Sequence, residues 1–408
     1  MRILFLTNYF PPEIGGASHL FYELATSLAE RGHQVTVVTG FPRYNVKEVD
    51  PHYRGKLLHE ERADGIRLLR VRTIPLPKEG KIARGLDHFA VAAILALRGL
   101  FSGAYDLVLI YSPPLPLGLS AWLLGRLKRI PFVVNIQDLF PREAVDLGVL
   151  TNPALIRVFE AIESFIYKRA DHITVHSSGN RDHVIVRGGH IDRVSVVYNW
   201  VDTDRILPLD RHNKFARQHD LDGRFVVSYA GTMGWCQDMS TIVRTAALLR
   251  DHQDILFLMV GDGAEKAKAQ QQADKLGLAN IQWLPMQSWQ VYPQVLAASD
   301  ISMINLNENL KTPVVPSKLL SIMAAGRPVV ASLPLEGDAP RLIEEAGAGL
   351  CVGPNDPEAL AGALLRLYGD EGLRQQCGSN GRRYAETHFS RATCIDQYEQ
   401  IFAHLAWR

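Results

Sequence analysis

Cysteine is scarce in this sequence, and the few cysteines are far apart. The four among 408 residues are Cys236, Cys351, Cys377 and Cys394. Four scattered cysteines cannot form a disulfide framework, and their spacing is not that of a zinc site. We therefore expect buried, reduced thiols in a protein of a reducing compartment.

Long apolar runs are missing as well. The longest, 89–97, is bounded by charged residues and is much shorter than the roughly 20 residues of a membrane-spanning helix. The chain begins with Met1-Arg2 and enters an expected strand at once, so we expect no cleaved signal peptide. These absences exclude an integral membrane protein with helical spans. They indicate a cytoplasmic protein that can still bind a membrane surface.

Neither sign of charge dominates. Lys and Arg number 44, Asp and Glu number 43, and the formal net charge is +1, so the chain is not a general binder of nucleic acid. With 47% hydrophobic and 21% charged residues, the composition is that of a soluble globular protein. The length corresponds to about two to three domains.

What the sequence does contain is an alternation of short apolar runs with helical segments. The expected strands are 3–7, 35–39, 107–111, 132–136, 173–176, 194–198, 225–230, 255–260, 281–284, 301–304, 329–331 and 350–352. Strands that are apolar throughout and alternate with helices predict an α/β fold with parallel sheets covered on both faces.

The alternation pauses once and then resumes, which predicts two domains. We expect an N-terminal Rossmann-like domain at 1–202, a linker at 203–223, a C-terminal Rossmann-like domain at 224–385 and a last helix at 386–408. Ligands of such sheets bind beyond the carboxyl ends of the strands. The loops that follow the strands are therefore the expected functional segments.

Two glycine loops follow expected strands. They are Gly15-Gly16 and Gly231-Thr232-Met233-Gly234, and each precedes a helix, which suits either a phosphate or simply a tight turn. Neither these loops nor Gly261-Asp262-Gly263 match the dinucleotide fingerprint GxGxxG, and no Walker sequence occurs. A nicotinamide enzyme and a P-loop NTPase are therefore disfavoured.

A third segment is a helix expected to begin near Ser317, a good N-cap, and to end at Gly326. Lys318 lies in its first turn, where the helix dipole favours anions. A cation in that place is explained if an anionic ligand binds beside it. The alternative is a solvated surface lysine.

Five segments occur in an order and at spacings that resemble one enzyme family. They are Gly15-Gly16, Tyr198-Asn199-Trp200-Val201-Asp202, Ala230-Gly231-Thr232-Met233-Gly234, Val260-Gly261-Asp262-Gly263 and 316–331. Over essentially its whole length the chain resembles the retaining nucleotide-sugar glycosyltransferases of family 4, which have the GT-B fold. The run Pro316-Ser317-Lys318-Leu319-Leu320 is similar to that of bacterial enzymes of O-antigen, capsule and colanic acid synthesis, including fucosyl- and N-acetylfucosaminyltransferases.

This resemblance implies two Rossmann-like domains facing a cleft, with the last helix returning to the N-terminal domain. It implies a nucleotide-diphosphate sugar donor, UDP-linked rather than GDP-linked, whose sugar could be an N-acetylated deoxyhexosamine. The implied acceptor is a lipid-diphosphate-linked saccharide at the inner membrane surface. No cofactor and no metal are expected, because the DxD form of Asp202-Thr203-Asp204 lies at the interdomain hinge.

The resemblance also implies the residues of the donor site. They are Gly15, Gly16, Asn199, Gly231, Thr232, Met233, Gly234, Gly261, Asp262, Gly263, Leu284, Pro285, Pro316, Ser317, Lys318 and Leu319.

The sequence departs from the family at the residues that usually hold the donor. Most members carry two glutamates eight positions apart, where this chain has Pro313 and Ser321. Most also carry an Arg and a Lys after the second glycine loop, where this chain has 234–238, sequence GWCQD. A departing diphosphate still needs a compensating charge, and Lys318 is the best remaining cation.

The acceptor side departs from the family in one residue. Many members have His-Asp after a strand, whereas this chain has Gln137-Asp138. We expect Asp138 and Lys318 to be the catalytic residues, with Asp138 orienting the acceptor hydroxyl or accepting its proton. A structural carboxylate is the alternative for Asp138.

The segment 72–101 combines cations with apolar residues. On a helix its apolar residues occupy both faces, so that helix is either buried or in contact with a membrane. The expected membrane and acceptor contacts are Lys78, Lys81, Arg84 and Arg98, which suit an anionic leaflet and a lipid diphosphate. A buried packing helix with scattered surface charges is the alternative.

Two other functions stay open at this point. A UDP-sugar 2-epimerase shares the GT-B fold and would act on a UDP-sugar without any acceptor. A non-catalytic partner subunit would explain why the glutamates and the basic pair are missing.

Overall fold

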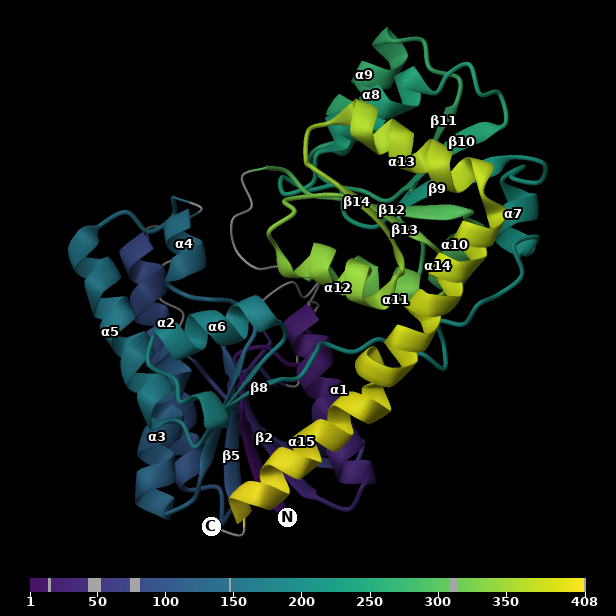
Figure 1. Ribbon diagram of the computed structural model, residues 1–408. Helices are drawn as coiled ribbons and strands as arrows, with labels where there is room; N and C mark the ends of the chain where they lie inside the picture. Colours follow the sequence, from purple (N-terminus) through teal and green to yellow (C-terminus); the bar gives the residue numbers. More distant parts are fainter. Residues whose placement is uncertain (14–15, 43–52, 74–80, 147, 309–314, 407–408) are drawn as a thin grey trace. The chain divides into compact units, whose positions relative to one another are not determined.

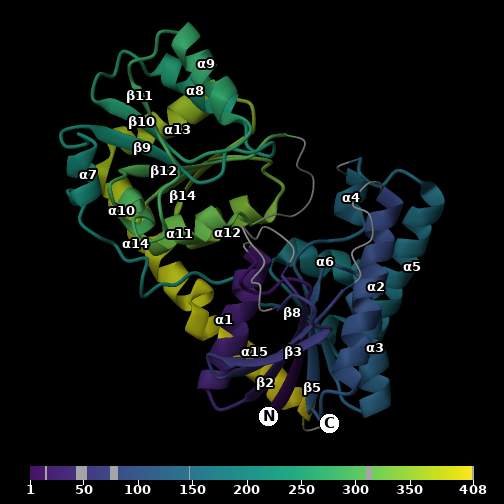
Figure 2. The same ribbon diagram turned by 180° about the vertical axis from the view of Figure 1, so that it is seen from behind.

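The computed structural model describes residues 1–13, 16–42, 53–73, 81–146, 148–308 and 315–406. The chain divides into two compact units. Unit 1 consists of Met1–Tyr198 and Cys394–Arg408, and unit 2 is Asn199–Thr393. Each unit is a mainly parallel sheet with helices on its faces (Figures 1 and 2), so the α/β prediction is confirmed.

The described part of unit 1 has an eight-stranded sheet in the order β3-β4-β2-β1-β5-β6-β7-β8. The strands are β1 (Arg2–Leu6), β2 (Gln34–Gly40), β3 (Leu58–Ala63), β4 (Ile66–Val71), β5 (Leu107–Ser112), β6 (Phe132–Ile136), β7 (His172–Val175) and β8 (Val194–Val196). The order reverses between β1 and β5, so the carboxyl ends of these two strands flank the topological switch point of unit 1.

The hairpin of β3 and β4 is the part of this sheet that the sequence does not predict. β3 pairs antiparallel with β4, and its sequence, LHEERA, has no apolar run because its residues are exposed or half-buried. It is an edge strand that forms by pairing with the buried β4. At the opposite edge, β8 ends at Val196, two residues before the predicted end at 198.

Helices cover both faces of this sheet. Both ribbon views show α2 (Lys81–Leu100), α3 (Pro116–Lys128) and α5 (Pro153–Arg169) on one side, and α1 (Gly16–Glu30) and α15 (Arg391–Ala406) on the other (Figures 1 and 2). The side chains of β1 alternate accordingly. Leu4 and Leu6 belong to the core beneath α2 and α3, whereas the ring of Phe5 lies 5.6 Å from that of Phe21 in α1. The remaining helices of unit 1 are α4 (Arg142–Asp146), α6 (Ser178–Val186) and the short η2 (Ile191–Arg193).

The last helix packs on unit 1, as the sequence predicts. Tyr398 of α15 is buried, and its hydroxyl accepts a hydrogen bond from the amide of Asn135 in β6 at 2.8 Å. Arg31 at the end of α1 forms ion pairs with Asp396 and Glu399 of α15, each at 2.5 Å. These contacts join residues more than 250 positions apart into one folded unit.

The two apolar faces of helix α2 differ in exposure to solvent. Val91, Ala92 and Leu95 are buried against the sheet and α3, whereas Leu97 is 60% exposed and Phe89 is 37% exposed. The helix is therefore a packing helix on one face and an apolar surface on the other.

Unit 2 has a six-stranded sheet, in the order β11-β10-β9-β12-β13-β14. The strands are β9 (Phe225–Ala230), β10 (Ile255–Val260), β11 (Ile281–Leu284), β12 (Ile301–Asn305), β13 (Val329–Ser332) and β14 (Gly349–Val352). All pair in parallel, and the order reverses between β9 and β12. The helices are α7 (Lys214–Gln218), α8 (Met239–Leu248), α9 (Lys266–Lys275), α10 (Tyr292–Ala297), α11 (Ser317–Ala324), α12 (Asp338–Ala346), α13 (Pro357–Gly369), α14 (Glu371–Tyr384) and the π-helical turn η3 (Ala385–Phe389).

The structure differs from the sequence predictions at three places. Ser317 is not an N-cap: α11 begins at Ser317 itself, and Pro316 precedes it without a capping side chain. Of the four free cysteines, Cys236 is exposed rather than buried. The segment 203–223 contains α7, whose Phe215 is buried in the core of unit 2.

Replacing Tyr398 by Phe tests how firmly α15 anchors unit 1. The change removes one of the two acceptors of the buried Asn135 amide, the other being the hydroxyl of Thr174, so we expect the free energy of unfolding to fall by about 1–3 kcal/mol. Chemical denaturation of the full chain measures it. The control is Tyr368→Phe, which also removes a tyrosine hydroxyl from a hydrogen bond, here to Asp254 at an exposed site. An equal loss in both variants would contradict a special role of the buried contact.

Candidate functional site

The loops at the switch point of unit 2 bring Lys318 against the second glycine loop. Lys318 is the second residue of α11, which follows β12, and Gly231 follows β9 directly. A Cβ atom built on Gly231 would lie 2.3 Å from Cε of Lys318, and the φ of Gly231 is +139°. The backbone conformation therefore favours glycine at 231, and the flexible end of the Lys318 side chain occupies the space that a Cβ atom would take.

The glycines after β10 are needed for a different reason. A Cβ atom on Gly261 would lie 1.9 Å from the carbonyl oxygen of Gly231, and one on Gly263 would lie 2.3 Å from that of Met233. The loops after β9 and β10 thus pack main chain against main chain. This packing holds in place the main chain beside which the Lys318 side chain lies.

The ammonium group of Lys318 is half-buried and weakly compensated. Its Nζ lies 5.0 Å from the centroid of the Tyr229 ring and 3.5 Å from the carbonyl oxygen of Thr232. Burial lowers the pKa of Lys318 to about 8, because the surrounding protein replaces part of the hydration of the charged form. A bound anion would restore the charged state, which is what a diphosphate site needs.

Several predicted donor-site residues lie at this edge without offering a side chain to a ligand. The side chains of Met233 and Leu319 are fully buried in the core, so only their main chains could reach a ligand. Gly234 donates its amide to the side chain of Gln237, and Gly263 donates to its neighbour Asp262. Ser317 is exposed and Pro316 is half-buried at the start of α11.

A second lysine at this edge is absent from the sequence prediction. Lys266, the first residue of α9, donates its Nζ to the carbonyl oxygens of Gly261 and Leu284, at 2.7 and 3.2 Å. It joins the ends of β10 and β11, and so connects Leu284 and the following Pro285 to the glycine loops. The only signal in the sequence is a lysine five residues after Gly261, which is too weak to single out.

Asn199 is the first residue of unit 2. Its segment runs beside η3 and the start of α15, where Val201 donates its amide to the carbonyl of Phe389 at 2.9 Å and pairs with Ser390. The structure thus brings Lys318, Gly231 and Gly261 together, and it places the segment of Asn199 beside η3, which packs against α11.

The carboxyl edge of unit 1 holds the predicted acceptor residue. Asp138 follows β6 and is open to solvent, yet its dense protein surroundings raise the pKa of the carboxyl group. Burial, and then Asp138, raise the pKa of Glu143. A carboxyl whose pKa is raised is a better proton acceptor when it does ionise, which suits a general base. Gly16 begins α1 after β1, whereas Gly15 lies outside the described residues.

Gln137, where many family members have histidine, bonds within its own sheet. The amide of Gln137 turns back into the sheet and donates to Asn135 at 3.0 Å, and Asn135 in turn donates to Tyr398 of α15 at 2.8 Å. The residue before Asp138 therefore belongs to the buried network that anchors the last helix.

Comparisons with known proteins identify the family of the chain. Residues 15–200 match the model of the glycosyl transferase 4-like domain, and residues 210–384 match that of the glycosyl transferases group 1. The chain belongs to the family 4 glycosyltransferases of GT-B fold.

The relatives of this glycosyltransferase include enzymes of several bacteria. It is 25% identical over 408 residues, 98% of each chain, to the "Putative colanic acid biosynthesis glycosyl transferase WcaI" of Escherichia coli K12. It is 28% identical over 290 residues to the "Probable glycosyltransferase WbjE" of Pseudomonas aeruginosa, covering 70% of this chain and 72% of that one. The crystal structure of Anabaena Alr3699/HepE in complex with UDP superposes with a TM-score of 0.75 at 19% identity, over 99% of this chain and 100% of that one.

The DxD sequence Asp202-Thr203-Asp204 has a structural role in unit 2. Asp202 accepts hydrogen bonds from the amides of Asp204 and Arg205, at 3.2 and 3.0 Å, so it closes a turn. Within the described ranges, no group of three or more His, Cys, Asp and Glu side chains could hold a metal ion. The expectation that no metal is used remains a prediction.

The predicted membrane residues are only partly described. Lys78 lies outside the described residues, and Lys81 and Arg84 lie in the first turn of α2 without described side chains. Arg98 turns toward the carboxylate of Glu60 at 3.9 Å and is 17% exposed. Across the part of the chain that the structure places, no helix is long and apolar enough to cross a bilayer.

The lowered pKa of Lys318 predicts a pH dependence of stability. Since the folded pKa of about 8 lies below the unfolded value of about 10.4, the charged lysine opposes folding below pH 8. That cost disappears as the pH rises from 8 to 10.4. Thermal unfolding of Lys318→Met should therefore show a Tm advantage over the wild type that shrinks between pH 7 and pH 10. A constant difference across this range, as expected for the exposed control Lys268→Met, would contradict the burial of the charge.

Proposed function

We propose that this glycosyltransferase moves a sugar from a UDP-linked donor, with retention of configuration, to a lipid-linked saccharide. The observation that carries the proposal is the Lys318 ammonium, held against Gly231 at the switch point of unit 2. Among the described residues it has no carboxylate partner. A bound anion would neutralise its charge. The diphosphate of a nucleotide sugar supplies that anion at the position where such folds bind ligands.

The names of similar proteins support a UDP-linked donor and a role in polysaccharide synthesis. The solved relative from Anabaena binds UDP, and two further structures of it hold UDP with glucose and UDP-glucose. The relative in Escherichia coli is named for colanic acid biosynthesis. We infer a role in bacterial surface polysaccharide synthesis on the cytoplasmic face of the inner membrane, with an N-acetylated deoxyhexosamine as the candidate sugar.

The proposed reaction uses positioning and charge rather than a protein nucleophile. The bond between the anomeric carbon and the diphosphate oxygen breaks, and a bond to the acceptor oxygen forms on the same face of the sugar. Lys318 stabilises the negative charge that develops on the departing diphosphate. The acceptor proton passes to the leaving phosphate or to Asp138, which also orients the hydroxyl.

A thermal-shift panel of UDP, GDP and dTDP, each with and without magnesium, tests the donor. We expect UDP to raise the Tm without metal, because a ligand that binds only the folded state stabilises it. The shift should be lost in Lys318→Ala, kept in the exposed control Lys268→Ala, and smaller above pH 8, where Lys318 loses its proton.

The outcomes separate the alternatives for this site. A UDP shift that is equal in Lys318→Ala and Lys268→Ala would remove Lys318 from the donor site. A response to none of the three nucleotides would favour a non-catalytic subunit. Conversion of a UDP-sugar in the absence of acceptor would identify an epimerase instead.

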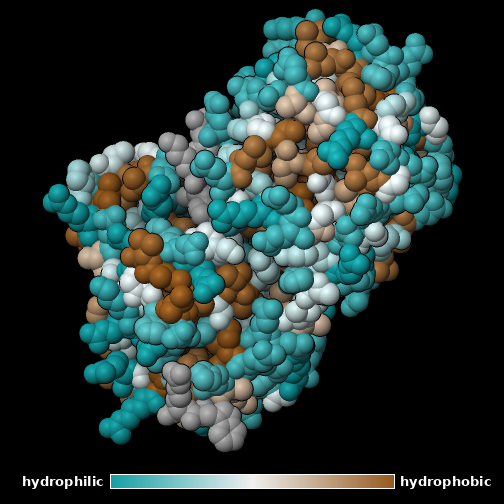
Figure 3. Space-filling view, in the orientation of Figure 1, coloured by the Kyte–Doolittle hydropathy of each residue, from teal (hydrophilic) through white to brown (hydrophobic). Residues whose placement is uncertain are grey.

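For the acceptor we propose that unit 1 docks on the membrane through α2 and α3. These helices enclose an apolar groove of about 310 Å³. Its exposed residues include Leu97 of α2 and Leu123 and Leu127 of α3, which are 60%, 45% and 57% exposed, and Phe101 lies just beyond α2. Apolar patches also interrupt the surface of both units in Figure 3, and scattered exposed apolar residues are ordinary. The groove differs because its apolar lining is continuous along two helices.

Unpaired cations lie on the other flank of α3. Arg126 and Arg129 line a second hollow, of about 400 Å³, together with Arg169 at the end of α5. No described residue forms an ion pair with these arginines, and the nearby Asp171 accepts a hydrogen bond from the amide of Phe132. Apolar side chains beside three arginines that outnumber the one carboxylate of this hollow fit an anionic bilayer surface.

Co-sedimentation with vesicles tests this surface. We expect the full chain to bind vesicles rich in phosphatidylglycerol at low salt and to ignore phosphatidylcholine. The double variant Leu123→Ser/Leu127→Ser should lose most binding, whereas Leu248→Ser, which removes a leucine 49% exposed on α8 of unit 2, should not. Binding that is equal in all three proteins would contradict docking through α3.

A further inference from the structure

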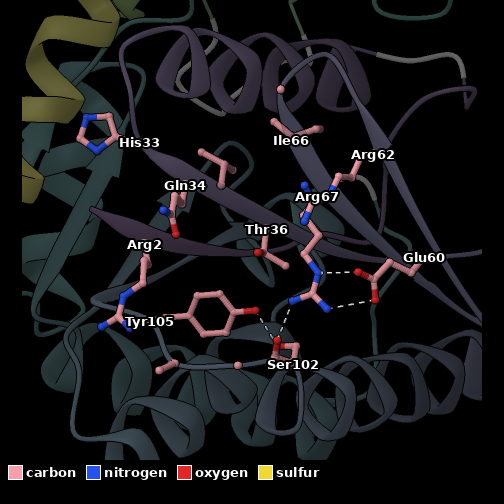
Figure 4. Close-up of a pocket in the computed structure, with 14 residues that line it drawn as sticks. Arg2, His33, Gln34, Thr36, Glu60, Arg62, Ile66, Arg67, Ser102 and Tyr105 are labelled. Atoms are coloured by element: carbon pink, nitrogen blue, oxygen red, sulfur yellow. Dashed lines mark hydrogen bonds and ion pairs between the residues drawn. The ribbon is translucent and has the colours of Figure 1, made fainter.

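A cavity of unit 1 lies at the edge of the sheet opposite to Asp138. It has a volume of about 650 Å³ and lies at the amino-terminal ends of β1, β2 and β4, just beyond the carboxyl end of α2. Figure 4 shows Arg2, Gln34, Thr36, Arg67 and Tyr105 surrounding it, with Arg62 and Glu60 at one side. The proposed transfer reaction uses none of these residues.

Arginines outnumber carboxylates at one side of this cavity. Arg67 forms a bidentate pair with Glu60, at 2.7 and 3.0 Å, and Arg98 lies 3.9 Å from the same carboxylate. Arg67, chiefly through its hydrogen bonds, and then Arg98 and Arg62 lower the pKa of Glu60, so this carboxylate is ionised at neutral pH. The single negative charge of Glu60 therefore neutralises one of the three guanidinium charges of Arg62, Arg67 and Arg98. Two positive charges remain.

Arg62 is the guanidinium left without a partner. It is exposed, and no hydrogen bond or ion pair joins it to any described residue. Its position makes this costly, because Arg62 and Arg67 are directly opposed in the antiparallel β3–β4 pair, and like charges opposite each other destabilise a hairpin. An anion between the two side chains would turn this repulsion into a pair of charge-assisted hydrogen bonds.

The other lining groups add no unpaired charge beside Arg67. Arg2 is paired with Asp106 at 2.6 Å, so it adds no net charge. Gln34 and Thr36 of β2 offer an amide and a hydroxyl on the same side as Arg67, since Thr36 lies beside Arg67 in the register. The carbonyl groups at the end of α2 are already bonded, because Lys128 donates to Leu100 and Gly103 and Arg67 donates to Ser102. The negative end of the helix dipole is thereby compensated before any ligand arrives.

We propose that this cavity is a second ligand site of the glycosyltransferase and takes a phosphate monoester. Arg62 and Arg67 bind its phosphate, and Gln34 and Thr36 face its uncharged part. Two uncompensated positive charges match the charge of a phosphate monoester. The volume is that of an ordinary small-molecule site.

The position of the site separates it from the reacting groups. The strands of unit 1 run for five to seven residues through most of the sheet, so the two edges lie roughly 15–20 Å apart. A ligand here cannot be the sugar donor or acceptor that meets Asp138. It would act as an effector or an anchor.

Calorimetric titration of the full chain with inorganic phosphate and with glycerol phosphate, at constant ionic strength, tests the site. We expect Arg62→Gln to weaken binding of both about tenfold, the value of one charged hydrogen bond. Glu60→Gln should strengthen binding at least about threefold, because it removes the competing carboxylate. The control Arg193→Gln removes an exposed arginine of unit 1 that lies outside the cavity, and it should leave the affinity unchanged.

The gain in Glu60→Gln is the sharpest readout, since a merely damaged hairpin would bind more weakly. The titrations are repeated in Lys318→Ala, because phosphate bound at the carboxyl edge of unit 2 would lose affinity there and not in Arg62→Gln. Equal affinities in Arg62→Gln and Arg193→Gln, weaker binding in Glu60→Gln, or no binding of either probe to the wild type would overturn the proposal. This test is independent of the donor, so its failure leaves the proposed transfer reaction untouched.

Discussion

Main-chain packing that only glycine allows holds the ammonium group of Lys318 in place. Because the loops after β9 and β10 touch through Gly231 and Gly261, no side chain separates them, and the stem of Lys318 fills the space beside Gly231. Burial then removes hydration from the charge. One result follows from the strand order, the two loops and the start of α11. It is a partly buried cation whose charge an anionic ligand can neutralise.

The sequence predicts the elements of the fold well where their apolar pattern is strong. Buried parallel strands such as β10, which is apolar throughout, and β5, which is apolar up to Ser112, are recognisable without a structure. β3 is not, because LHEERA is a charged edge strand whose stability comes from its neighbour. The two faces of α2 could not be separated either, since an apolar residue reads the same in sequence whether it contacts a core or solvent.

The candidate site is predictable in its parts but not in its contacts. The glycine loops and Lys318 stand out in the sequence, yet Lys318 and Tyr229, whose ring its ammonium faces, are 89 positions apart. Lys266 has no distinguishing neighbours in the sequence, and its role depends on carbonyl groups that two strands bring to one edge. The departures from the family pattern are clear in the sequence, but their physical consequence depends on burial, which the sequence does not contain.

The return of α15 to unit 1 has a consequence for how the chain folds during synthesis. Arg31 and Asp396, which pair across this unit, are separated by 365 positions. While the ribosome makes the chain, unit 1 must wait with an uncovered surface beside β6 until α15 emerges, whereas unit 2 is continuous in sequence and can fold first. The N-terminal half of the protein therefore completes its fold only after the last helix has been made.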